Sequence, residues 1–445
     1  MTMIVGLGKT GLSVAHFLAR RGESFVLADS RMQPHGLADV QARYPHVPIY
    51  LGPFDKKLFA RQARIVLSPG VSLDEPAVRA AQQAGVEVLG DIELFARYVD
   101  APVVGITGSN GKSTVTTLLA EMALAAGLEV RVGGNLGTPA LELLLESDDA
   151  GSPDLYVLEL SSFQLETVST LECKFATVLN LSVDHMDRHG AMADYIACKQ
   201  RVFHGVGVQV LNADDELVAA MAESGREIRW FALSVPDDDK NYGLADCDGR
   251  TYLCCGAEQI IAVDELKIAG RHNWANVLAA LALADALSMP RQAALAALRE
   301  FKGLPHRCQW LARINGVDWF DDSKGTNVGS TVAALAGMPG NKVVLIAGGD
   351  GKGQDFSPLH KAVSDYARAV VLIGRDAALL DQAIDGAAPV VYAGYSLVQA
   401  VQESAKLAQP GDTVLLSPAC ASFDMFTDYV HRAEVFKAAV QEVAA

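Results

Sequence analysis

Residues 105–114 of the chain read GITGSNGKST, and this stretch decides how the rest of the sequence is interpreted. The common phosphate-binding loop has the spacing G-x-x-x-x-G-K-[ST], which would place a glycine at position 106. Ile106 stands there instead, and the nearest glycines are Gly105 and Gly108. An apolar run before the loop predicts a strand, and a helix is predicted from Lys112. Because N–H groups at a helix start favour anions, we predict a nucleotide-binding loop, with a glycine turn beside an incidental lysine as the alternative.

Short apolar runs alternate with Ala/Leu-rich helical stretches along the whole chain, which is typical of βαβ units, parallel sheets and the α/β class. The runs predict strands at 3–5, 25–28, 65–67, 103–106, 156–160, 176–180, 342–347, 370–373 and 413–417. We expect three domains, formed by residues 1–91, 92–302 and 303–445. Residues 208–268 are richer in strand and turn signals and are expected to form an inserted sheet.

The composition limits the class of protein. Half of the 445 residues are hydrophobic, but no apolar run approaches the ~18 residues needed to cross a membrane. The start of the chain lacks the basic region of a signal peptide, and the seven cysteines include no C-x-x-C pair, so we expect reduced thiols and a cytoplasmic protein. A formal net charge of −16 argues against nucleic-acid binding, so anionic substrates must be held by local cations, helix N-termini or metal.

A second glycine loop, GLGKTG, opens the chain at residues 6–11. Gly6, Gly8 and Gly11 fit the spacing G-x-G-x-x-G, and Asp29 stands at the end of the next predicted strand. This combination is the dinucleotide fingerprint, with the acid on the ribose. The loop itself specifies only a diphosphate at a helix N-terminus beside a ribose, so a UDP group fits equally well. A second nucleotide loop in the same chain favours UDP.

Several polar residues stand near the ends of predicted strands, where open α/β sheets bind ligands. Glu159 interrupts an apolar strand, and a buried carboxylate requires a metal or a basic partner. The run DHMDRH at 184–189 is compatible with a Mg²⁺ role, a zinc site or a loop without a role. Lys199, on a predicted helix, is by itself most simply a solvated lysine. Asn273 pairs with an adenine edge or caps its helix.

Three polar runs follow strands of the last part of the chain: FDDSKGTN at 320–327, AGGDGKG at 347–353 and LLSPACASFDMF at 415–426. If these strands belong to one parallel sheet, the three loops lie along one edge of it and form one side of a cleft. The run GLPHRCQW places Arg307 beside His306 at the joint before this part of the chain.

These motifs together resemble the Mur ligases, ATP-dependent amide-forming enzymes of peptidoglycan synthesis. The resemblance covers about residues 4–434 and rests on T-G-S-N-G-K-S-T, E-L-S-S-F-Q-L-E, D-H-M-D-R-H, G-x-H-N, H-R, D-D-S-K-x-T-N, G-G-D-G-K and S-P-A-C-A-S-F-D, in this order. The Mur-type loop T-G-x-N-G-K-[ST] needs no glycine at 106. The N-terminal glycine loop, the S-P-G at 68–70 and the absence of D-N-P-R bring the chain nearest to the member that adds D-glutamate to UDP-N-acetylmuramoyl-L-alanine.

The resemblance implies a Rossmann-like N-terminal domain for UDP, a P-loop-type central ATPase domain and a Rossmann-like C-terminal domain for the amino acid. It implies an acyl-phosphate and a tetrahedral intermediate, with ADP and phosphate as products. ATP would be a substrate, and two Mg²⁺ ions, with Mn²⁺ as an alternative, would assist. The implied protein is a monomer without nucleic-acid partners.

The resemblance also implies roles for individual residues. The UDP substrate would contact Gly8, Lys9, Thr10, Gly11, Asp29, Ser30, Arg31, Ser68, Pro69, Gly70 and Asn135. ATP would contact Gly108, Ser109, Asn110, Gly111, Lys112, Ser113, Thr114, Asn273, Arg307 and Asp322. D-Glutamate would contact Thr326, Lys352, Ser422, Phe423 and Tyr429. Metal would be held by Ser113, Glu159, His185 and Lys199, the last as its carbamate, and Lys112, His185 and Lys199 would be catalytic.

Three other functions stay open, of which a non-catalytic nucleotide-binding regulator is the most distant. Another Mur-type or folylpolyglutamate-type ligase would share the central motifs but accept a different amino acid. A nicotinamide-dependent oxidoreductase would use the loop at residues 6–11 and would change NADH fluorescence on mixing.

Overall fold

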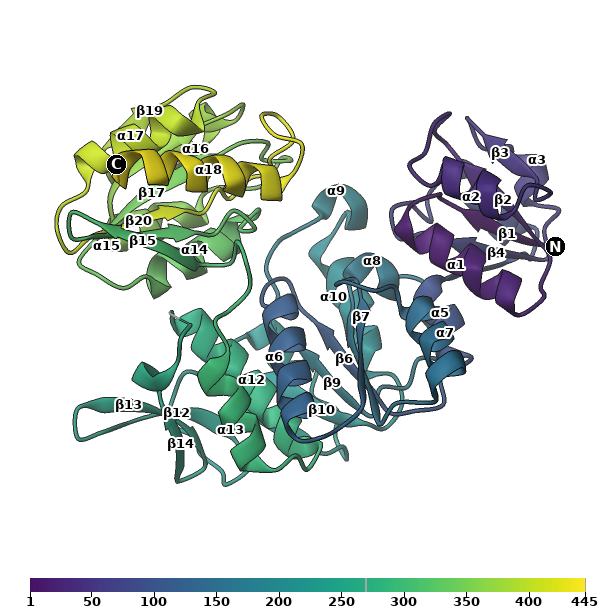
Figure 1. Cartoon of the computed structure of the whole chain (residues 1–445), viewed down its shortest axis with the longest axis horizontal. Helices are drawn as coiled ribbons and strands as arrows, with labels where there is room; N and C mark the ends of the chain where they lie inside the picture. The colour runs from purple at the N-terminus through teal and green to yellow at the C-terminus, as the bar shows by residue number, and fades with distance from the viewer. Residues whose placement is uncertain (269, 445) are drawn as a thin grey trace.

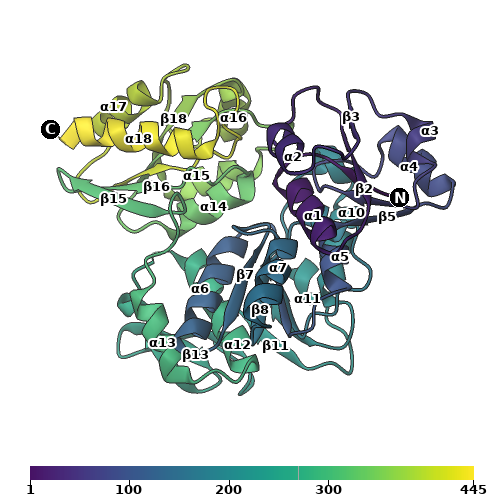
Figure 2. The same ribbon diagram turned by 45° about the vertical axis from the view of Figure 1, so that its right-hand side comes forward.

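The computed structural model describes residues 1–268 and 270–444, which form three α/β units (Figure 1). The first and third units both lie above the central unit in Figures 1 and 2. The central unit contacts each of them, through α7 (Ala140–Ala150) against α1 (Lys9–Arg20) on one side and α12 (Arg271–Ala286) against α14 (Val328–Gly337) on the other. None of the described helices is long and apolar enough to span a membrane.

The first unit is a parallel five-stranded sheet of order β3-β2-β1-β4-β5. Its strands are β1 (Thr2–Val5), β2 (Phe25–Asp29), β3 (Ile49–Leu51), β4 (Arg64–Leu67) and β5 (Glu87–Gly90), joined through α1, α2 (Leu37–Arg43), α3 (Lys56–Phe59) and α4 (Pro76–Gln83). The strand order reverses between β1 and β4. Ligands bind at such a switch point, so the loops that follow β1 and β4 define one candidate site.

The central unit is a nine-stranded sheet of order β14-β13-β12-β11-β10-β9-β6-β8-β7. Its strands are β6 (Val103–Thr107), β7 (Val130–Gly134), β8 (Leu155–Glu159), β9 (Phe175–Val178), β10 (Val208–Asn212), β11 (Ile228–Phe231), β12 (Tyr242–Cys247), β13 (Arg250–Cys255) and β14 (Glu258–Ala262). Its helices are α5 (Asp91–Ala96), α6 (Lys112–Ala125), α7, α8 (Ser162–Leu165), α9 (Met186–His189), α10 (Met192–Gln200), η1 (Arg201–Phe203), α11 (Glu216–Ala219), η2 (Val263–Glu265), α12 and α13 (Arg291–Glu300).

The expectation of an inserted sheet over 208–268 is wrong. The apolar strand β10 pairs in parallel with β9, and β11 continues the same ladder, so this segment extends the central sheet. Within this sheet only the pairs β12–β13 and β13–β14 are antiparallel, and the turn at Asp248 and Gly249, both with positive φ, joins β12 to β13. The turn signals that suggested a separate sheet belong to this edge.

The third unit is a six-stranded sheet of order β15-β16-β20-β17-β18-β19, parallel except for the edge strand β15. Its strands are β15 (Gln309–Ile314), β16 (Val317–Asp321), β17 (Val343–Gly348), β18 (Ala367–Ile373), β19 (Val390–Tyr392) and β20 (Thr413–Leu416). Its helices are α14, α15 (Pro358–Tyr366), α16 (Ala377–Ile384), α17 (Leu397–Leu407) and α18 (Tyr429–Ala444). Because β16, β20 and β17 are parallel neighbours, the loops that follow them meet at one edge, as predicted.

Every strand predicted from the sequence is present, with ends shifted by up to three residues. The predicted strands are buried apolar runs, as expected for parallel sheets covered on both faces. Strands absent from the prediction include the edge strands β3 and β19, which are three residues long and only partly buried. The edge strands β5, β7 and β15 were also not predicted, and each of them is partly exposed.

Candidate active site

The loop between β6 and α6 lies at the point where the central strand order reverses, since β6 stands between β9 and β8. Gly108 and Gly111 both have positive φ, of 148° and 86°, so their conformations favour glycine. A Cβ on Gly111 would lie 2.3 Å from Oδ1 of Asn276, on α12. The loop is therefore pressed against α12, and α6 begins at Lys112 as predicted.

Two asparagines that the sequence analysis did not select contact this loop, Asn180 through hydrogen bonds and Asn276 through packing on Gly111. Asn180, just after β9, accepts a hydrogen bond at Oδ1 from the N–H of Asn110 (2.8 Å) and donates from Nδ2 to the carbonyl of Asn110 (3.1 Å). Asn276 lies three residues after Asn273 on α12, and its Nδ2 donates to Oδ1 of Asn273 at 3.3 Å. The i, i+3 spacing on a helix, which places two residues on one face, is the signal that could have found Asn276.

A pocket lies beside this loop and is lined by residues of α12 and of the third unit. Six of the ten residues expected to bind ATP line it: Asn110, Gly111, Thr114, Asn273, Arg307 and Asp322. Gly108, Ser109, Lys112 and Ser113 belong to the adjoining turn and first helical residues. The helix-cap interpretation of Asn273 is wrong, because Gly270 is the N-cap of α12 and Asn273 lies within its first turn.

Lys112 folds back over the glycine loop. Its Nζ donates to the carbonyl oxygens of Gly108 (2.7 Å) and Ser109 (2.9 Å). Burial lowers the pKa of Lys112 below its usual value, while the nearby carboxylates of Glu159 and Asp184 oppose that shift. The lysine is thus partly desolvated at a helix N-terminus, where a phosphate oxygen would be a strong partner.

Asp322, in the loop after β16, has an unusual environment. Burial raises its pKa to about 7, although hydrogen bonds from Ser417 Oγ (2.7 Å) and the N–H of Cys308 (3.2 Å) favour the ionised form. A carboxyl group with this pKa at a pocket wall is a candidate for ligand recognition.

Lys324 also lines the pocket, and the sequence analysis gave it no role. Its Nζ lies 3.8 Å from the ring centroid of Tyr429. Burial, together with the positive charges of Arg307, Lys112 and Lys352, lowers the pKa of Lys324 to about 8. Four cations therefore gather between the central and third units of a chain with a net charge of −16, as expected for a site that binds anions.

Glu159, at the end of β8, provides the clearest sign of a metal site. It is 3 % exposed; its Oε1 accepts from Nδ2 of Asn135 at 2.6 Å, while its Oε2 is buried without a hydrogen-bond partner. A buried carboxylate oxygen without a partner suits a hard cation. No group of three His, Cys, Asp or Glu side chains within residues 1–268 and 270–444 is arranged to hold a metal, which does not favour the zinc alternative.

His185 is held by an aromatic contact. It has a positive φ of 57° at the N-cap of α9, and its ring lies 4.7 Å from that of Phe163, centroid to centroid. Its Nε2 lies 3.7 Å from Oδ2 of Asp184. Burial lowers the pKa of His185, Asp184 opposes that shift, and Lys352 of the third unit adds to it. The positive charges of Lys352 and Lys112 therefore act on this imidazole.

Lys199, on α10, is not solvated. It is 1 % exposed, and its Nζ donates to the carbonyl of Gly108 at 2.8 Å and to Oγ1 of Thr107 at 3.3 Å. Burial lowers its pKa well below the usual value, and Lys112 adds to this effect. The solvated-lysine interpretation is wrong, because the α10 face that bears Lys199 packs against the glycine loop.

A second pocket lies at the switch point of the first sheet and reaches the central unit. It is lined by ten of the eleven residues expected on the UDP side: Gly8, Lys9, Thr10, Asp29, Ser30, Arg31, Ser68, Pro69, Gly70 and Asn135. Gly11 is the exception, because it packs inward: a Cβ there would lie 1.8 Å from the carbonyl oxygen of Gly6. Asn135 links the two sites, since it lines this pocket and bonds Glu159.

Asp29, the acid of the dinucleotide fingerprint, already accepts hydrogen bonds at all of its lone-pair sites. Asp29 accepts from the N–H of Leu7 (2.7 Å) and from the N–H, Nε and Nη2 of Arg31 (2.9, 2.9 and 2.7 Å). Burial raises its pKa, but these hydrogen bonds prevail and hold it at about 2. A carboxylate has about four lone-pair sites, and all are used. Asp29 thus positions Arg31 and, in this arrangement, has no acceptor left for a ribose, whether that of a dinucleotide or that of UDP.

The residues expected to bind D-glutamate come from the three loops at the edge of the third sheet, with Tyr429 at the start of α18. Ser422 is buried, whereas Lys352 and Phe423 are exposed. Tyr429 contacts these loops, because its carbonyl accepts from Oγ of Ser323 at 2.8 Å. The loops are further joined by the N–H of Ala419, which donates to the carbonyl of Gly325 at 2.9 Å.

Three α/β units, two nucleotide-type loops and a cationic cleft define a Mur-type ligase, and comparison with known families agrees. The profiles of the MurD-like N-terminal domain, the Mur ligase middle domain and the Mur glutamate ligase domain match residues 1–90, 106–284 and 306–420. The chain belongs to the Mur ligase family.

The similar curated proteins share one name. The UDP-N-acetylmuramoylalanine--D-glutamate ligase of Nitrosococcus oceani is 54% identical over 99% of this chain and 96% of the relative. That of Thiobacillus denitrificans is 51% identical over 100% of this chain and 96% of the relative. Among solved structures, a pseudomurein peptide ligase of Methanothermus fervidus (TM-score 0.61, 17% identity, 99% of both chains) and MurF of Acinetobacter baumannii (TM-score 0.61, 16% identity, 99% of this chain and 90% of that one) share the fold.

Proposed function

We propose that this protein is an ATP-dependent ligase that joins D-glutamate to UDP-N-acetylmuramoyl-L-alanine in peptidoglycan precursor synthesis. The observation that carries the proposal is the name shared by relatives that are about half identical over nearly the whole chain. The site supports it, because a cluster of cations lies between the nucleotide loop and the third unit. In this proposal residues 1–91 bind the UDP part, 92–302 bind ATP and 303–445 bind the amino acid.

The reaction proceeds in two steps. A carboxylate oxygen of the UDP substrate attacks the γ-phosphorus of ATP, the P–O bond to ADP breaks, and an acyl phosphate forms. The amine of D-glutamate then attacks the acyl carbon, the tetrahedral intermediate expels phosphate, and the amine loses a proton. Lys112, Arg307 and Lys324 neutralise the oxygens that gain charge during phosphoryl transfer.

The residues around Glu159 fit a divalent cation. Ser113, Glu159, His185 and Lys199, the last as its carbamate, would hold Mg²⁺, or Mn²⁺, at two positions beside the glycine loop. When bound there, the metal supplies positive charge beside phosphate oxygens. The neutral amine that reacts with CO₂ is favoured at Lys199, because burial lowers its pKa.

The amino acid would be held by Thr326, Lys352, Ser422, Phe423 and Tyr429. Lys352 is exposed in the loop after β17, and its positive charge lowers the pKa of both His185 and Lys324. An exposed lysine in this loop suits a carboxylate of D-glutamate, and the Ser422 hydroxyl adds a donor.

Phosphate release from ATP tests the proposal. Wild-type protein with UDP-N-acetylmuramoyl-L-alanine, ATP and Mg²⁺ is expected to release phosphate in multiple turnovers only when D-glutamate is added. Replacing D-glutamate with L-glutamate, L-lysine or diaminopimelate separates the proposal from other Mur-type ligases. Release that depends on one of these amino acids and not on D-glutamate would contradict the proposed specificity.

Variants of the third unit locate the amino-acid site. Lys352→Ala and Ser422→Ala are expected to raise the KM for D-glutamate at least tenfold, since each removes a donor to a carboxylate. The KM values for ATP and the UDP substrate serve as the internal control. Unchanged use of D-glutamate by both variants would place its site elsewhere.

A further inference from the structure

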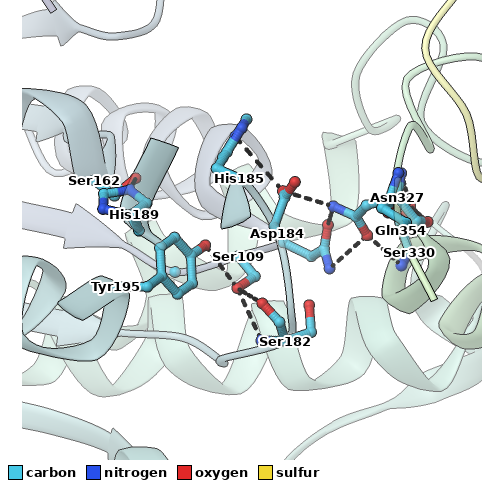
Figure 3. A network of polar contacts seen from close by, with 12 residues as sticks. Ser109, Ser162, Ser182, Asp184, His185, His189, Tyr195, Asn327, Ser330 and Gln354 are labelled. Carbon is cyan, nitrogen blue, oxygen red and sulfur yellow. Dashed lines mark hydrogen bonds and ion pairs between the residues drawn. The ribbon is translucent and has the colours of Figure 1, made fainter. Parts of the chain in front are cut away.

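The first helix of the third unit touches the nucleotide loop through its cap residue (Figure 3). Asn327 precedes α14, and its side-chain oxygen accepts from the N–H of Ser330 at 2.8 Å, as an N-cap does. Its Nδ2 points away from the helix, toward the central unit. It donates to Oδ1 of Asn110 at 3.2 Å and to Oδ2 of Asp184 at 3.1 Å.

The two partners of Asn327 lie next to residues that are expected to act in catalysis. Asn110 stands in the glycine loop two residues before Lys112, and Asn180 fixes its backbone on the other side. Asp184 precedes His185, and Figure 3 shows its carboxylate between the imidazole and the amide of Asn327. One amide thus contacts both the loop that would hold the triphosphate and the residue beside a proposed metal ligand.

The surrounding packing requires a close approach of the two units. Asn327 is 6 % exposed, so its hydrogen bonds are shielded from water. Gly329, in the first turn of α14, faces the central unit, and a Cβ there would lie 2.8 Å from Oγ of Ser182. That glycine allows α14 to lie against the 180–184 segment, which contains Asp184, one of the two partners of Asn327.

We propose that Asn327 is a positioning residue that couples the seating of the third unit to the arrangement of the nucleotide loop. The proposal rests on the ligase function proposed above. Thr326, the preceding residue, is expected to contact D-glutamate, so the amino-acid site and the loop are joined through two consecutive residues. When the third unit is seated, Asn327 holds Asn110 and Asp184, and with them Lys112 and His185, in the arrangement that phosphoryl transfer needs.

A purely structural role for Asn327 as a helix cap makes a different prediction. Ser and Asp are about as good at an N-cap as Asn. Asn327→Ser keeps a cap but is too short to reach the central unit. Asn327→Asp keeps the cap and the length but replaces the donor with a negative charge beside Asp184. If capping is the whole role, both variants behave as wild type.

The test compares stability, binding and turnover in these two variants. We expect the thermal unfolding midpoint and the KM for the UDP substrate to stay near the wild-type values. We expect kcat for phosphate release with all three substrates to fall at least ~10-fold in Asn327→Ser, because three partly buried hydrogen bonds to the central unit are lost, one of them to a carboxylate. Asn327→Asp should fall further, because like charges then face each other. Wild-type kcat in both variants would overturn the proposal.

Gly329→Ala tests the close approach of the two units independently of Asn327. Alanine favours a helix over glycine, so the variant should be at least as stable as wild type, yet its methyl group would hold α14 away from Ser182. We expect kcat to fall while stability does not. Ala336→Ser, at an exposed position of the same helix, is the matched control and should keep full turnover. Full turnover in Gly329→Ala would show that the close approach is not required.

A double-mutant cycle isolates the contact itself. If Asn327 acts partly through the loop, Asn327→Ser should lower kcat by a smaller factor in protein that already carries Asn110→Ser than in wild type, where the contact with Asn110 is lost as well as that with Asp184. Fully multiplicative losses would overturn the coupling. Failure of the proposed function is recognised separately, because wild-type protein itself would then release no phosphate with D-glutamate.

Discussion

Arg307 donates a hydrogen bond from its Nη2 to the hydroxyl of Ser113, at 2.8 Å. Arg307 belongs to the segment that enters the third unit, and Ser113 is the second residue of α6 in the central unit. This contact places a guanidinium beside the loop that would hold the triphosphate. Guanidinium groups suit phosphate because their N–H donors form a planar fork.

Arg307→Lys and Arg307→Ala are therefore expected to impair the use of ATP. Hydrogen bonds to charged groups contribute ~1.5–3 kcal/mol, so kcat/KM for ATP should fall about 10- to 100-fold. Lysine should recover little of the loss, since it retains the charge but not the fork. Calorimetric titration with UDP-N-acetylmuramoyl-L-alanine provides the control, because that pocket lies at the first sheet. A wild-type kcat/KM in Arg307→Lys would show that a point charge suffices.

Substitutions at two glycines of the first loop should affect different properties, ligand binding at Gly8 and stability at Gly11. A Cβ on Gly8 would have no neighbour within 4 Å, so Gly8→Val should fold normally and obstruct only the pocket, raising the KM for the UDP substrate more than that for ATP. A Cβ on Gly11 would lie 1.8 Å from a backbone oxygen, so Gly11→Ala should be destabilised by ~3 kcal/mol or more. Denaturant unfolding and steady-state kinetics measure the two effects. Equal unfolding losses would refute this division.

The sequence predicted the features that depend on residue type and strand position. Runs such as Val343–Gly348 are apolar throughout and end in loops, so their sheet and the location of its ligand edge follow from pattern alone. The residues that hold the nucleotide loop in place could not be predicted from the sequence pattern. Asn180 holds it through amide hydrogen bonds between segments distant in sequence, and an isolated asparagine carries no periodic signal. Asn276 packs against Gly111 from α12, and only its i, i+3 spacing from Asn273 points to that position.

The same limit applies to charge. The fingerprint correctly placed Asp29 at the end of β2, but only the structure reveals that its four acceptor sites are filled by Arg31 and Leu7. Lys199 was ambiguous for a related reason: a lysine on a helix is usually solvated, and only the packing of α10 on the glycine loop buries it. Burial depends on tertiary packing, which local sequence does not encode.

Asp91 should make stability depend on pH. It is 2 % exposed, and burial raises its pKa to about 6 from 3.8, although a hydrogen bond from Gln164 opposes the shift. Because the folded-state pKa is the higher one, the folded protein retains a proton that the unfolded chain loses. The resulting stabilisation is complete below pH ~4 and is lost as the pH rises through about 6.

Asp91→Asn removes this titration. Relative to wild type, the variant should gain about 1.4 kcal/mol in the free energy of unfolding between pH 5 and pH 7.5, as the two pKa values imply. Urea unfolding at both pH values measures the gain, and Asp39→Asn, at an exposed position, is the control. A difference between Asp91→Asn and wild type that does not change with pH would contradict the assignment.

Lys199 provides the last prediction. A free ammonium beside a divalent cation would repel it, whereas the carbamate formed from the neutral amine and CO₂, with release of a proton, offers two oxygens. Lys199→Ala should therefore lose turnover through weaker metal binding, and a small added carboxylate such as acetate should restore part of it. Lys324→Ala, which also removes a partly buried lysine of the cleft, should not be rescued. Full wild-type activity in CO₂-depleted buffer, together with no rescue of Lys199→Ala, would rule the carbamate out.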